Sequence, residues 1–354
     1  LEAHATERPL PSPRTVFFGG GTPSLLPIDA MRRLIIGLKQ RFDLSRVDEW
    51  TIEVNPATAN LEYLQMLREL GIDRLSFGAQ SFDPAELKML ERHHDPDDVV
   101  QSITLARQAG FERLNLDLIY AIPGQSLASW DRSIRQALDL GTTHLSCYGL
   151  TYEPNTAMTV RKRLGEFTPA ADEMELEMFA HVRHTLAAHG IEWYEISNYA
   201  KPGEECRHNL VYWHGGNYIG IGPSAASHVE GHRFKNVPRL ADWESAVPSG
   251  DLAVIEHEIL TPQQRAHEAM MLQLRLRQGV RWSTLLTHSR TLGESAGCGD
   301  RHSTLDTRNS TLQQTYAPTL QKLNSLGLIN VTESGFSLTE SGMNVADGIA
   351  AEFE

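Results

Sequence analysis

Three polar side chains lie within or directly beside apolar stretches of the sequence, where a binding site could form. They are Glu53, Gln80 and Asp117, each on a separate stretch. Burying a carboxylate is costly unless the group is paired or hydrogen-bonded. One such residue is commonly a satisfied polar group of a core, whereas three on successive stretches favour a shared polar pocket. Arg92, which follows a short helical pattern, could supply the positive partner.

A run of glycines follows the first apolar stretch and reads Gly19-Gly20-Gly21-Thr22-Pro23. Consecutive glycines permit positive φ and allow another molecule to approach the backbone closely. Thr22 adds a hydroxyl group, and Pro23 stiffens the exit from the run. The spacing is not G-x-G-x-x-G and no Walker lysine follows, so neither the dinucleotide-binding nor the P-loop motif fits. A tight turn with no ligand remains the alternative.

The segment from Asn198 to Asn217 combines histidines with aromatic residues. His208 and His214 occur near Tyr199, Tyr212, Trp213 and Tyr218. A histidine in such a setting can be a packed residue. It can also be an axial ligand of a flat macrocycle on which the aromatic rings stack.

The cysteines of the sequence do not form a recognisable metal-binding motif. Cys147, Cys206 and Cys298 are far apart, and no two of them have metal-ligand spacing. A sparse and odd number of cysteines predicts a reducing, cytoplasmic environment. We expect free buried thiols at Cys147 and Cys298. The stretch Glu91–Asp95 resembles a metal cluster, but adjacent residues do not converge on one ion, so we interpret it as the solvated end of a helix.

The composition is that of an ordinary globular protein, with 354 residues of which 41% are hydrophobic and 22% charged. The formal net charge of −13 argues against a general nucleic-acid-binding or anionic-membrane surface. The sequence has no run of 18 apolar residues that could span a membrane, and residues 1–13 contain no signal-peptide core. Because the first residue is Leu1, in a helix-like stretch, we expect the chain to start within a larger protein.

Apolar stretches alternate regularly with helical patterns from Thr15 onward. The predicted strands are Thr15–Phe18, Trp50–Val54, Arg74–Phe77, Arg113–Ile119, His144–Leu150 and Glu192–Ile196. The predicted helices are Met31–Phe42, Leu61–Leu70, Val99–Ala109, Ser129–Leu140 and Asp172–His189, and each of the last four stops at a glycine. Such alternation predicts a parallel sheet with right-handed crossovers. The number of units favours a barrel or partial barrel, with its site at the carboxyl ends of the strands.

The sequence changes character after Asp242. The predicted elements are a linker (Pro248–Asp251), a helix (Thr261–Leu276), a polar surface insertion (Thr287–Gln313), a helix (Thr319–Leu326), two strands (Leu328–Thr332 and Phe336–Leu338) and a closing helix. This order is typical of a winged-helix-like domain. Its acidic balance and the lack of a basic recognition helix weigh against DNA binding. We therefore interpret it as a packing or partner-binding module.

Five motifs together point to a known family. They are Gly19–Ser24, Ile52–Pro56, Arg74–Phe82, Asn115–Tyr120 and His208–Trp213. With these motifs the chain resembles the coproporphyrinogen-oxidase-like branch of the radical S-adenosylmethionine (SAM) proteins, from about Thr15 to the C-terminus. Within that branch, the H-N-x-x-Y-W motif at His208–Trp213 is similar to the motif of the heme chaperones. The resemblance implies a partial TIM-like radical SAM (β/α) barrel over residues 1–200, a linking segment over 201–250 and the winged-helix-like domain over 251–354.

The resemblance also implies which residues bind ligands. The residues implied for SAM are Gly20, Gly21, Thr22, Glu53, Gln80, Arg92 and Asp117. The residues implied for heme are His208, Tyr212 and Trp213, with His208 as a candidate ligand of the heme iron. The chemistry of SAM agrees with the first set, because a cationic sulfonium, an amino-acid head and a ribose suit backbone groups and carboxylates.

The sequence departs from this family in one respect. Members hold a [4Fe–4S] cluster on a C-x-x-x-C-x-x-C loop, which precedes the glycine run by about one β–α unit. The three cysteines here are too far apart to form such a loop. We expect either a chain that lacks the N-terminal unit or a cluster-free relative. In either case we expect no reductive cleavage of SAM by the sequence as it stands.

Three functions follow as hypotheses. The favoured one is a heme chaperone, which binds heme and passes it to acceptor hemoproteins. The alternative is an oxygen-independent coproporphyrinogen III oxidase (dehydrogenase) of porphyrin biosynthesis, and the third is a degenerate barrel that serves as an interaction protein. We expect a cytoplasmic protein with no nucleic-acid partner and no membrane span. The strand edges of an open barrel favour association, so a homodimer is also expected.

Overall fold

The structure is a computed structural model that describes residues 12–154, 156–246, 253–289 and 301–353, with the backbone alone for residues 301–312. The described chain forms two units, one from Ser12 to His208 and one from Asn209 onward. Each unit is described below by itself.

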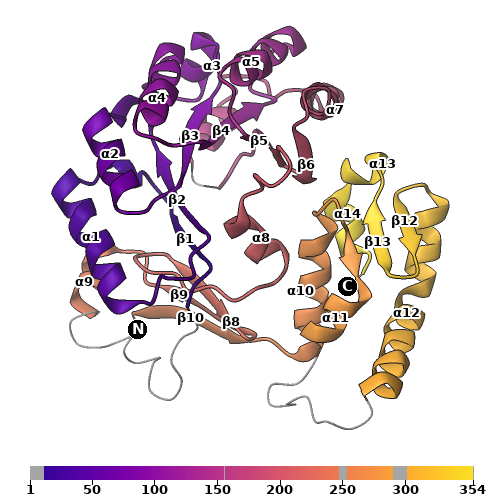
Figure 1. Ribbon diagram of the computed structural model, residues 1–354. Helices are drawn as coiled ribbons and strands as arrows, with labels where there is room; N and C mark the ends of the chain where they lie inside the picture. Colours follow the sequence, from indigo (N-terminus) through magenta and orange to yellow (C-terminus); the bar gives the residue numbers. More distant parts are fainter. Residues whose placement is uncertain (1–11, 155, 247–252, 290–300, 354) are drawn as a thin grey trace. The chain divides into compact units, whose positions relative to one another are not determined.

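The first unit is built on a seven-stranded sheet with the order β1-β2-β3-β4-β5-β7-β6. The strands are β1 (Thr15–Phe18), β2 (Glu49–Val54), β3 (Arg74–Gln80), β4 (Arg113–Tyr120), β5 (His144–Gly149), β6 (Glu192–Glu195) and β7 (Asn198–Ala200). Strands β1 to β5 pair in parallel. The sheet is curled into a partial barrel, and Figure 1 shows the helices along its outer side. The prediction of a parallel, barrel-like sheet is confirmed for these strands.

The five helices predicted for this unit form within three residues of their predicted bounds, and the structure describes three more. They are α1 (Ile28–Arg41), α2 (Leu61–Glu69), α3 (Pro84–Met89), α4 (Pro96–Gln108), α5 (Leu127–Asp139), α6 (Ala157–Arg163), α7 (Asp172–Ala187) and the start of α8 (Arg207–Trp213), with short 3-10 turns η1 (Pro23–Leu25) and η2 (Pro56–Thr58). Side chains of Asn60, Asp95 and Ser126 cap α2, α4 and α5. The four predicted glycine stops all have positive φ, which an L residue rarely adopts.

A hairpin replaces the simple sixth strand that the sequence predicted. Strand β7 pairs antiparallel with β5, and β6 pairs antiparallel with β7, so β6 is not the neighbour of β5. The chain reverses after Glu195, whose carboxylate accepts a hydrogen bond from the amide of Ser197 at 3.1 Å. The three-residue strand β7 is too short to give an alternating pattern of its own, which is why the sequence did not reveal it.

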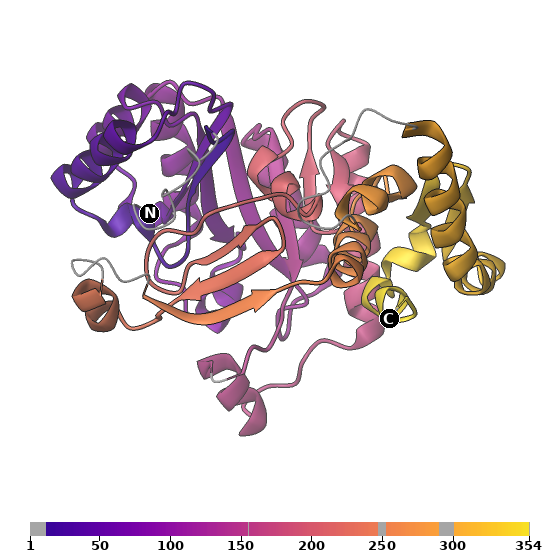
Figure 2. The same cartoon turned by 90° about the horizontal axis from the view of Figure 1, so that it is seen from below.

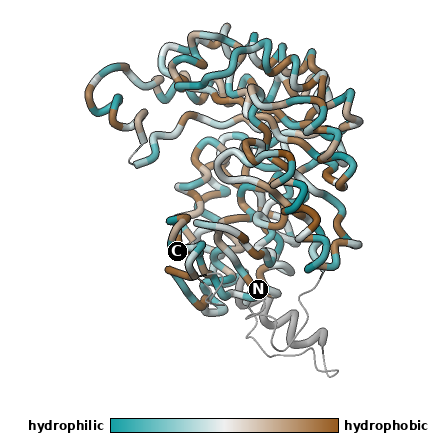
Figure 3. The backbone as a smooth tube through the Cα atoms, turned by 90° about the vertical axis from the view of Figure 1, so that its left-hand side faces the viewer, coloured by the Kyte–Doolittle hydropathy of each residue, from teal (hydrophilic) through white to brown (hydrophobic). Residues whose placement is uncertain are grey.

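Alternation along the strands gives the sheet one apolar and one polar face. Ile52, Leu75 and Leu116 are fully buried on the apolar face. Polar residues alternate with the apolar ones along β2, β3, β4 and β5 and so share the opposite face. They are Glu49, Thr51, Glu53, Arg74, Ser76, Arg113, Asn115, Asp117, His144 and Ser146. Figure 3 shows hydrophobic stretches in brown and hydrophilic stretches in teal along the backbone. The polar face carries the candidate site.

The second unit contains two three-stranded antiparallel sheets, β10-β9-β8 and β11-β13-β12. Its elements are β8 (Ala226–Val229), β9 (His232–Asn236), α9 (Leu240–Ala246), β10 (Val254–Ile259), α10 (Pro262–Leu274), β11 (Val280–Arg281), α11 (Trp282–His288), α12 (Arg301–Ser325), β12 (Ile329–Thr332), β13 (Gly335–Leu338), α13 (Glu340–Met343) and α14 (Ala346–Ala351). Helices α10 to α12 with the β11-β13-β12 sheet form the winged-helix-like domain that the sequence predicted. In Figure 2 the β8–β10 sheet is seen in orange.

Helix α12 corrects one part of the sequence prediction. It begins at Arg301 and runs through Pro318, whereas the sequence indicated a polar insertion up to Gln313 and a helix from Thr319. An internal proline costs a helix about 3 kcal/mol, which is why the sequence placed the helix after it. Tyr316, Leu320 and Leu323 are buried along one stripe that crosses this position, so packing outweighs the proline. Residues 290–300, which include Cys298, and the linker residues 248–251 lie outside the described residues.

Candidate functional site

The glycine run lies at the carboxyl end of β1, beside the end of β2. The amide of Gly20 donates a hydrogen bond to Oε2 of Glu53 at 3.2 Å. Gly20 and Gly21 have φ of 77° and 87°, and a Cβ added at either would meet no atom within 4 Å. Glycine is required here by the backbone conformation rather than by crowding. The open space leaves the backbone accessible to a ligand.

A second carboxylate, that of Asp117, lies on the same polar face as Glu53. Asp117 accepts hydrogen bonds from Asn115 Nδ2 at 2.8 Å and from Ser76 Oγ at 3.3 Å. Burial raises the pKa of Asp117 above its ordinary value, and its hydrogen bonds oppose this only in part. Burial, together with the charge of Asp117, raises the pKa of Glu53 to about 7. Two acids that are this reluctant to ionise favour a cationic ligand between or beside them.

Gln80 and Arg92, which were also predicted for SAM, take no part in these polar contacts. Gln80 ends β3 with a positive φ of 64°, and Arg92 is exposed beside a surface pocket of about 380 Å³ that Lys88 and His93 also line. Within the described residues, no hydrogen bond or ion pair joins the side chains of Thr22, Gln80 or Arg92 to Gly20, Glu53 or Asp117. The structure therefore brings Gly20, Glu53 and Asp117 together through polar contacts and charge, and the assignment of all seven residues to SAM stays a prediction.

Sequence reasoning missed a residue that holds the loop before Arg92. Nη1 of Arg161, on α6, donates to the carbonyl of Met89 at 3.1 Å and to Oε1 of Glu91 at 3.1 Å. Glu91 has a positive φ of 56°, so its backbone needs external support. Three consecutive basic residues, Arg161 to Arg163, were the only signal in the sequence.

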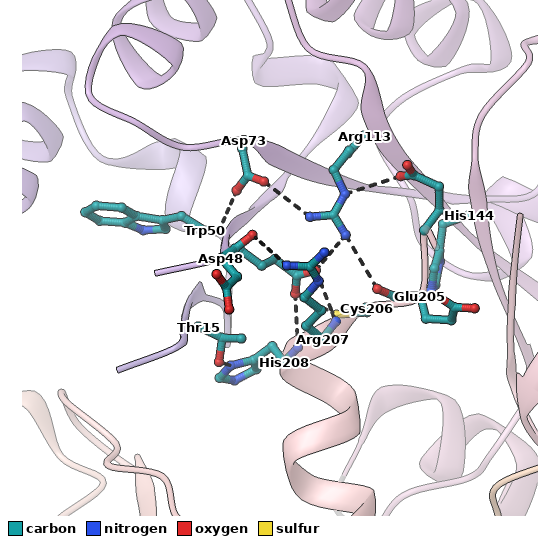
Figure 4. A network of polar contacts seen from close by, with 12 residues as sticks. Thr15, Asp48, Trp50, Asp73, Arg113, His144, Glu205, Cys206, Arg207 and His208 are labelled. Carbon is teal, nitrogen blue, oxygen red and sulfur yellow. Dashed lines mark hydrogen bonds and ion pairs between the residues drawn. The ribbon is translucent and has the colours of Figure 1, made fainter. Parts of the chain in front are cut away.

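A dense polar network lies at the amino ends of the same strands (Figure 4). Its centre is the buried carboxylate of Glu49, which starts β2. This carboxylate accepts hydrogen bonds from the amides of Arg207 and His208, each at 3.0 Å, and lies 3.4 Å from Sγ of Cys206. The first turn of α8 is thereby fixed to β2, although the two are about 158 residues apart in sequence.

Arg113 completes this network as the cation of Glu49. It donates to Glu49 at 2.8 Å, and to Asp73 and Glu204 at 3.2 Å each. Burial by itself raises the pKa of Glu49, but Arg74, the two α8 amides and Arg113 outweigh it and lower the pKa overall. Glu49 is therefore an ionised, buried group.

His208 lies against β1 on the polar face of the sheet. Its ring stacks on Phe17, with ring centroids 5.0 Å apart and planes 18° apart, and its Nδ1 lies 2.8 Å from Oγ1 of Thr15. Burial is the main cause that lowers the pKa of His208 to about 4. The imidazole is therefore neutral at pH 7, which is the form that binds a metal.

The aromatic residues of the same motif make their described contacts in the second unit. The ring of Tyr212 packs edge-on against Tyr218 at 4.6 Å, and the guanidinium of Arg275 lies over Trp213 at 5.0 Å. Nε1 of Trp213 is buried and has no hydrogen-bond partner among the described residues. Tyr212 and Trp213 therefore pack against neighbouring side chains at the end of α8.

Comparisons with known proteins identify the family. The Radical SAM superfamily profile matches residues 6–137. The heme chaperone HemW of Synechocystis is 37% identical over 283 residues, which cover 78% of this chain and 68% of that protein. HemW of Bacillus subtilis is 33% identical over 347 residues, which cover 97% of this chain and 86% of that protein. The chain belongs to the HemW family of radical SAM proteins.

The fold of this HemW family member is also that of a solved relative. The coproporphyrinogen III oxidase HemN of Escherichia coli superposes with a TM-score of 0.77 over 96% of this chain and 77% of that one, at 21% identity. This likeness shows the fold, and it confirms the radical SAM barrel predicted from the motifs. No helix in the described parts of the chain is long and apolar enough to cross a membrane.

The described residues of this family member do not fit an iron–sulfur cluster. Cys147 is buried in β5, and burial raises the pKa of its thiol, which disfavours the thiolate that iron requires. Cys206 is buried beside Glu49. Among residues 12–154, 156–246, 253–289 and 313–353, no three His, Cys, Asp or Glu side chains form a metal-binding group. The stretch Glu91–Asp95 lies between α3 and α4, and the interpretation as a solvated helix end is wrong for His94, which is buried with its Nε2 3.0 Å from the carbonyl of Ala79.

Proposed function

We propose that this chain is a heme chaperone, which binds heme and passes it to acceptor hemoproteins. The observation that carries the proposal is the similarity to proteins named HemW, which extends over 97% of the chain in the Bacillus subtilis comparison. The residues proposed for heme are His208, Tyr212 and Trp213 of α8. The neutral state of His208 supports its role as a ligand of the heme iron.

We also propose that the glycine run and the carboxylates of the polar face bind SAM. The residues are Gly20, Gly21, Thr22, Glu53, Gln80, Arg92 and Asp117. Open space beside the glycines supports close approach of the ligand. The raised pKa of Glu53 supports a cationic ligand, because a sulfonium or ammonium group offsets the cost of ionising a buried acid.

The [4Fe–4S] cluster that the family implies would supply an electron for SAM cleavage. The described residues do not fit such a cluster, so the proposed function takes no step through it. The chain's own groups bind and orient SAM and heme. A cytoplasmic location and a homodimer belong to the same proposal, the first from the sparse cysteines and the second from the edge position of β1 in the sheet.

The proposal is tested by titrating the purified chain with heme and following the Soret absorption. We expect saturable binding at one heme per chain and transfer of that heme to an apo-hemoprotein, detected by the acceptor's own spectrum. Binding without transfer would contradict the chaperone function. Conversion of coproporphyrinogen III by the same preparation would favour the oxidase instead.

A further inference from the structure

The carboxylate of Glu49 caps the start of α8 from a neighbouring strand. The amides at the start of an α-helix have no partner within the helix, and a side chain such as Ser, Thr, Asp or Asn usually satisfies them. The residue before α8 is Cys206, which is not among these caps. Glu49 of β2 instead accepts hydrogen bonds from the amides of Arg207 and His208.

A short helix needs such support. Helix α8 has seven residues, and helices of this length are marginal in water by themselves. The negative charge of Glu49 at the helix start also matches the helix dipole. Arg74, the two amides and Arg113 together keep this carboxylate ionised. The guanidinium of Arg113 lies 2.8 Å from Glu49 and 3.2 Å from Glu204, on the segment that leads into α8.

The same contacts determine where the ring of His208 lies. The His208 amide is bound by Glu49, while its ring stacks on Phe17 and its Nδ1 contacts Thr15. Phe17 and Thr15 belong to β1, which pairs with β2 in the register Thr15 to Glu49. Backbone and ring of His208 are therefore held by adjacent strands of one sheet.

We infer that Glu49 is a positioning residue for heme, which acts by holding the first turn of α8 and thereby the imidazole of His208. The inference about heme rests on the proposed function. The inference that Glu49 holds the turn does not.

Two measurements test separately whether Glu49 holds the first turn of α8 and whether this matters for heme binding. The first is the rate at which a maleimide labels Cys206 in a background where Cys147 and Cys298 are serine, because Cys206 is buried beside Glu49. The second is the affinity for heme and the position of the Soret band. The variants are Glu49→Gln, which keeps the size of the side chain and removes its charge, and Glu49→Ala.

The matched control is Glu86→Gln. Glu86 is also a buried carboxylate of the first unit, with hydrogen bonds from Ser129 at 2.6 Å and Gln125 at 2.9 Å, and none of its described contacts is with α8. Circular dichroism identifies variants that fold, and if Glu49→Ala does not fold, Glu49→Gln carries the test.

In both Glu49 variants we expect the maleimide to label Cys206 at least about tenfold faster than in the parent. We also expect heme to bind about tenfold more weakly and the Soret band to shift. Glu86→Gln should match the parent in labelling rate, heme affinity and Soret position. A folded Glu49→Gln chain that labels at the parent rate overturns the inference. Faster labelling with unchanged heme binding overturns the role of Glu49 in the heme site. If the parent itself binds no heme, the proposed function fails, and the labelling rate alone decides whether Glu49 holds α8.

Discussion

The amide of Gly20 and the carboxylate of Glu53 form a hydrogen bond of 3.2 Å across the ends of β1 and β2. The bond joins two parts of the proposed SAM site. One is the glycine turn, whose backbone a ligand can approach, and the other is the acid Glu53, whose negative charge a cationic ligand would stabilise. This hydrogen bond is the one polar contact that lowers the pKa of Glu53, against burial and the charge of Asp117.

Replacing Glu53 with glutamine should weaken SAM binding by about tenfold, or about 1.4 kcal/mol, because the neutral amide no longer attracts the sulfonium. Isothermal titration calorimetry with SAM measures the change. Glu62→Gln, at an exposed position of α2, is the control and should bind as the parent does. Equal affinity in the Glu53 variant would remove this residue from the proposed pocket.

The pKa of Glu53, about 7 against an ordinary value of 4.5, predicts a pH dependence. Below pH 7 the acid must lose a proton before it can pair with SAM, so the affinity should fall as the pH drops from 7.5 to 5.5, by about tenfold in total at most, which is the loss expected for Glu53→Gln. Titrations at pH 5.5, 6.5 and 7.5 measure this. In the Glu53→Gln variant the slope should be absent, and a slope that persists there would have to arise from another group.

The raised pKa of Glu53 also makes folding stability depend on pH, with the opposite sign from that of a salt-bridged acid, whose pKa is lowered. A folded-state pKa raised above the unfolded value contributes stability that is complete below pH 4.5 and is lost as pH rises through about 7. Glu53→Gln should therefore melt above the parent at pH 8, with a smaller difference at pH 5. Calorimetric melting curves at the two pH values test this, and a difference that does not change with pH would contradict the assignment.

Replacing His208 with alanine should weaken heme binding by about tenfold or more and shift the Soret band, since the proposed axial ligand is lost. The control is His189→Ala, because His189 is exposed at the end of α7 and its Nδ1 contacts only the carbonyl of Thr185 among its described side-chain contacts. Spectra identical to the parent would show that His208 is a packing residue held by Phe17 and Thr15. The neutral imidazole predicts no loss of binding between pH 8 and 6 from His208 itself.

Arg161→Ala should loosen the loop that presents Arg92 and weaken SAM binding by about threefold to tenfold. The guanidinium of Arg161 holds the carbonyl of Met89 and the carboxylate of Glu91, whose backbone has positive φ. Arg163→Ala, an exposed neighbour on α6, removes the same charge without these contacts. If the two variants bind SAM equally, the effect is one of net charge and the loop does not depend on Arg161.

The sequence by itself determined the parallel strands, the helices that stop at glycine and the polar residues at the strand ends. These features follow from local rules, because side-chain alternation and the positive φ of glycine act over a few residues. Five motifs taken together, from Gly19–Ser24 to His208–Trp213, indicated the family, which the comparisons then confirmed. Glu53 and Asp117 were found in this way because each interrupts an apolar stretch.

Tertiary structure alone decided the remaining features. Glu49 lies 158 residues before the amide of Arg207, so no local pattern could reveal that it caps α8. Strand β7 and the course of α12 through Pro318 likewise depend on partners that are distant in sequence. The physical reason is the same in each case: a buried charge, a short strand and an internal proline are all unfavourable locally, and contacts formed only in the folded chain offset their cost.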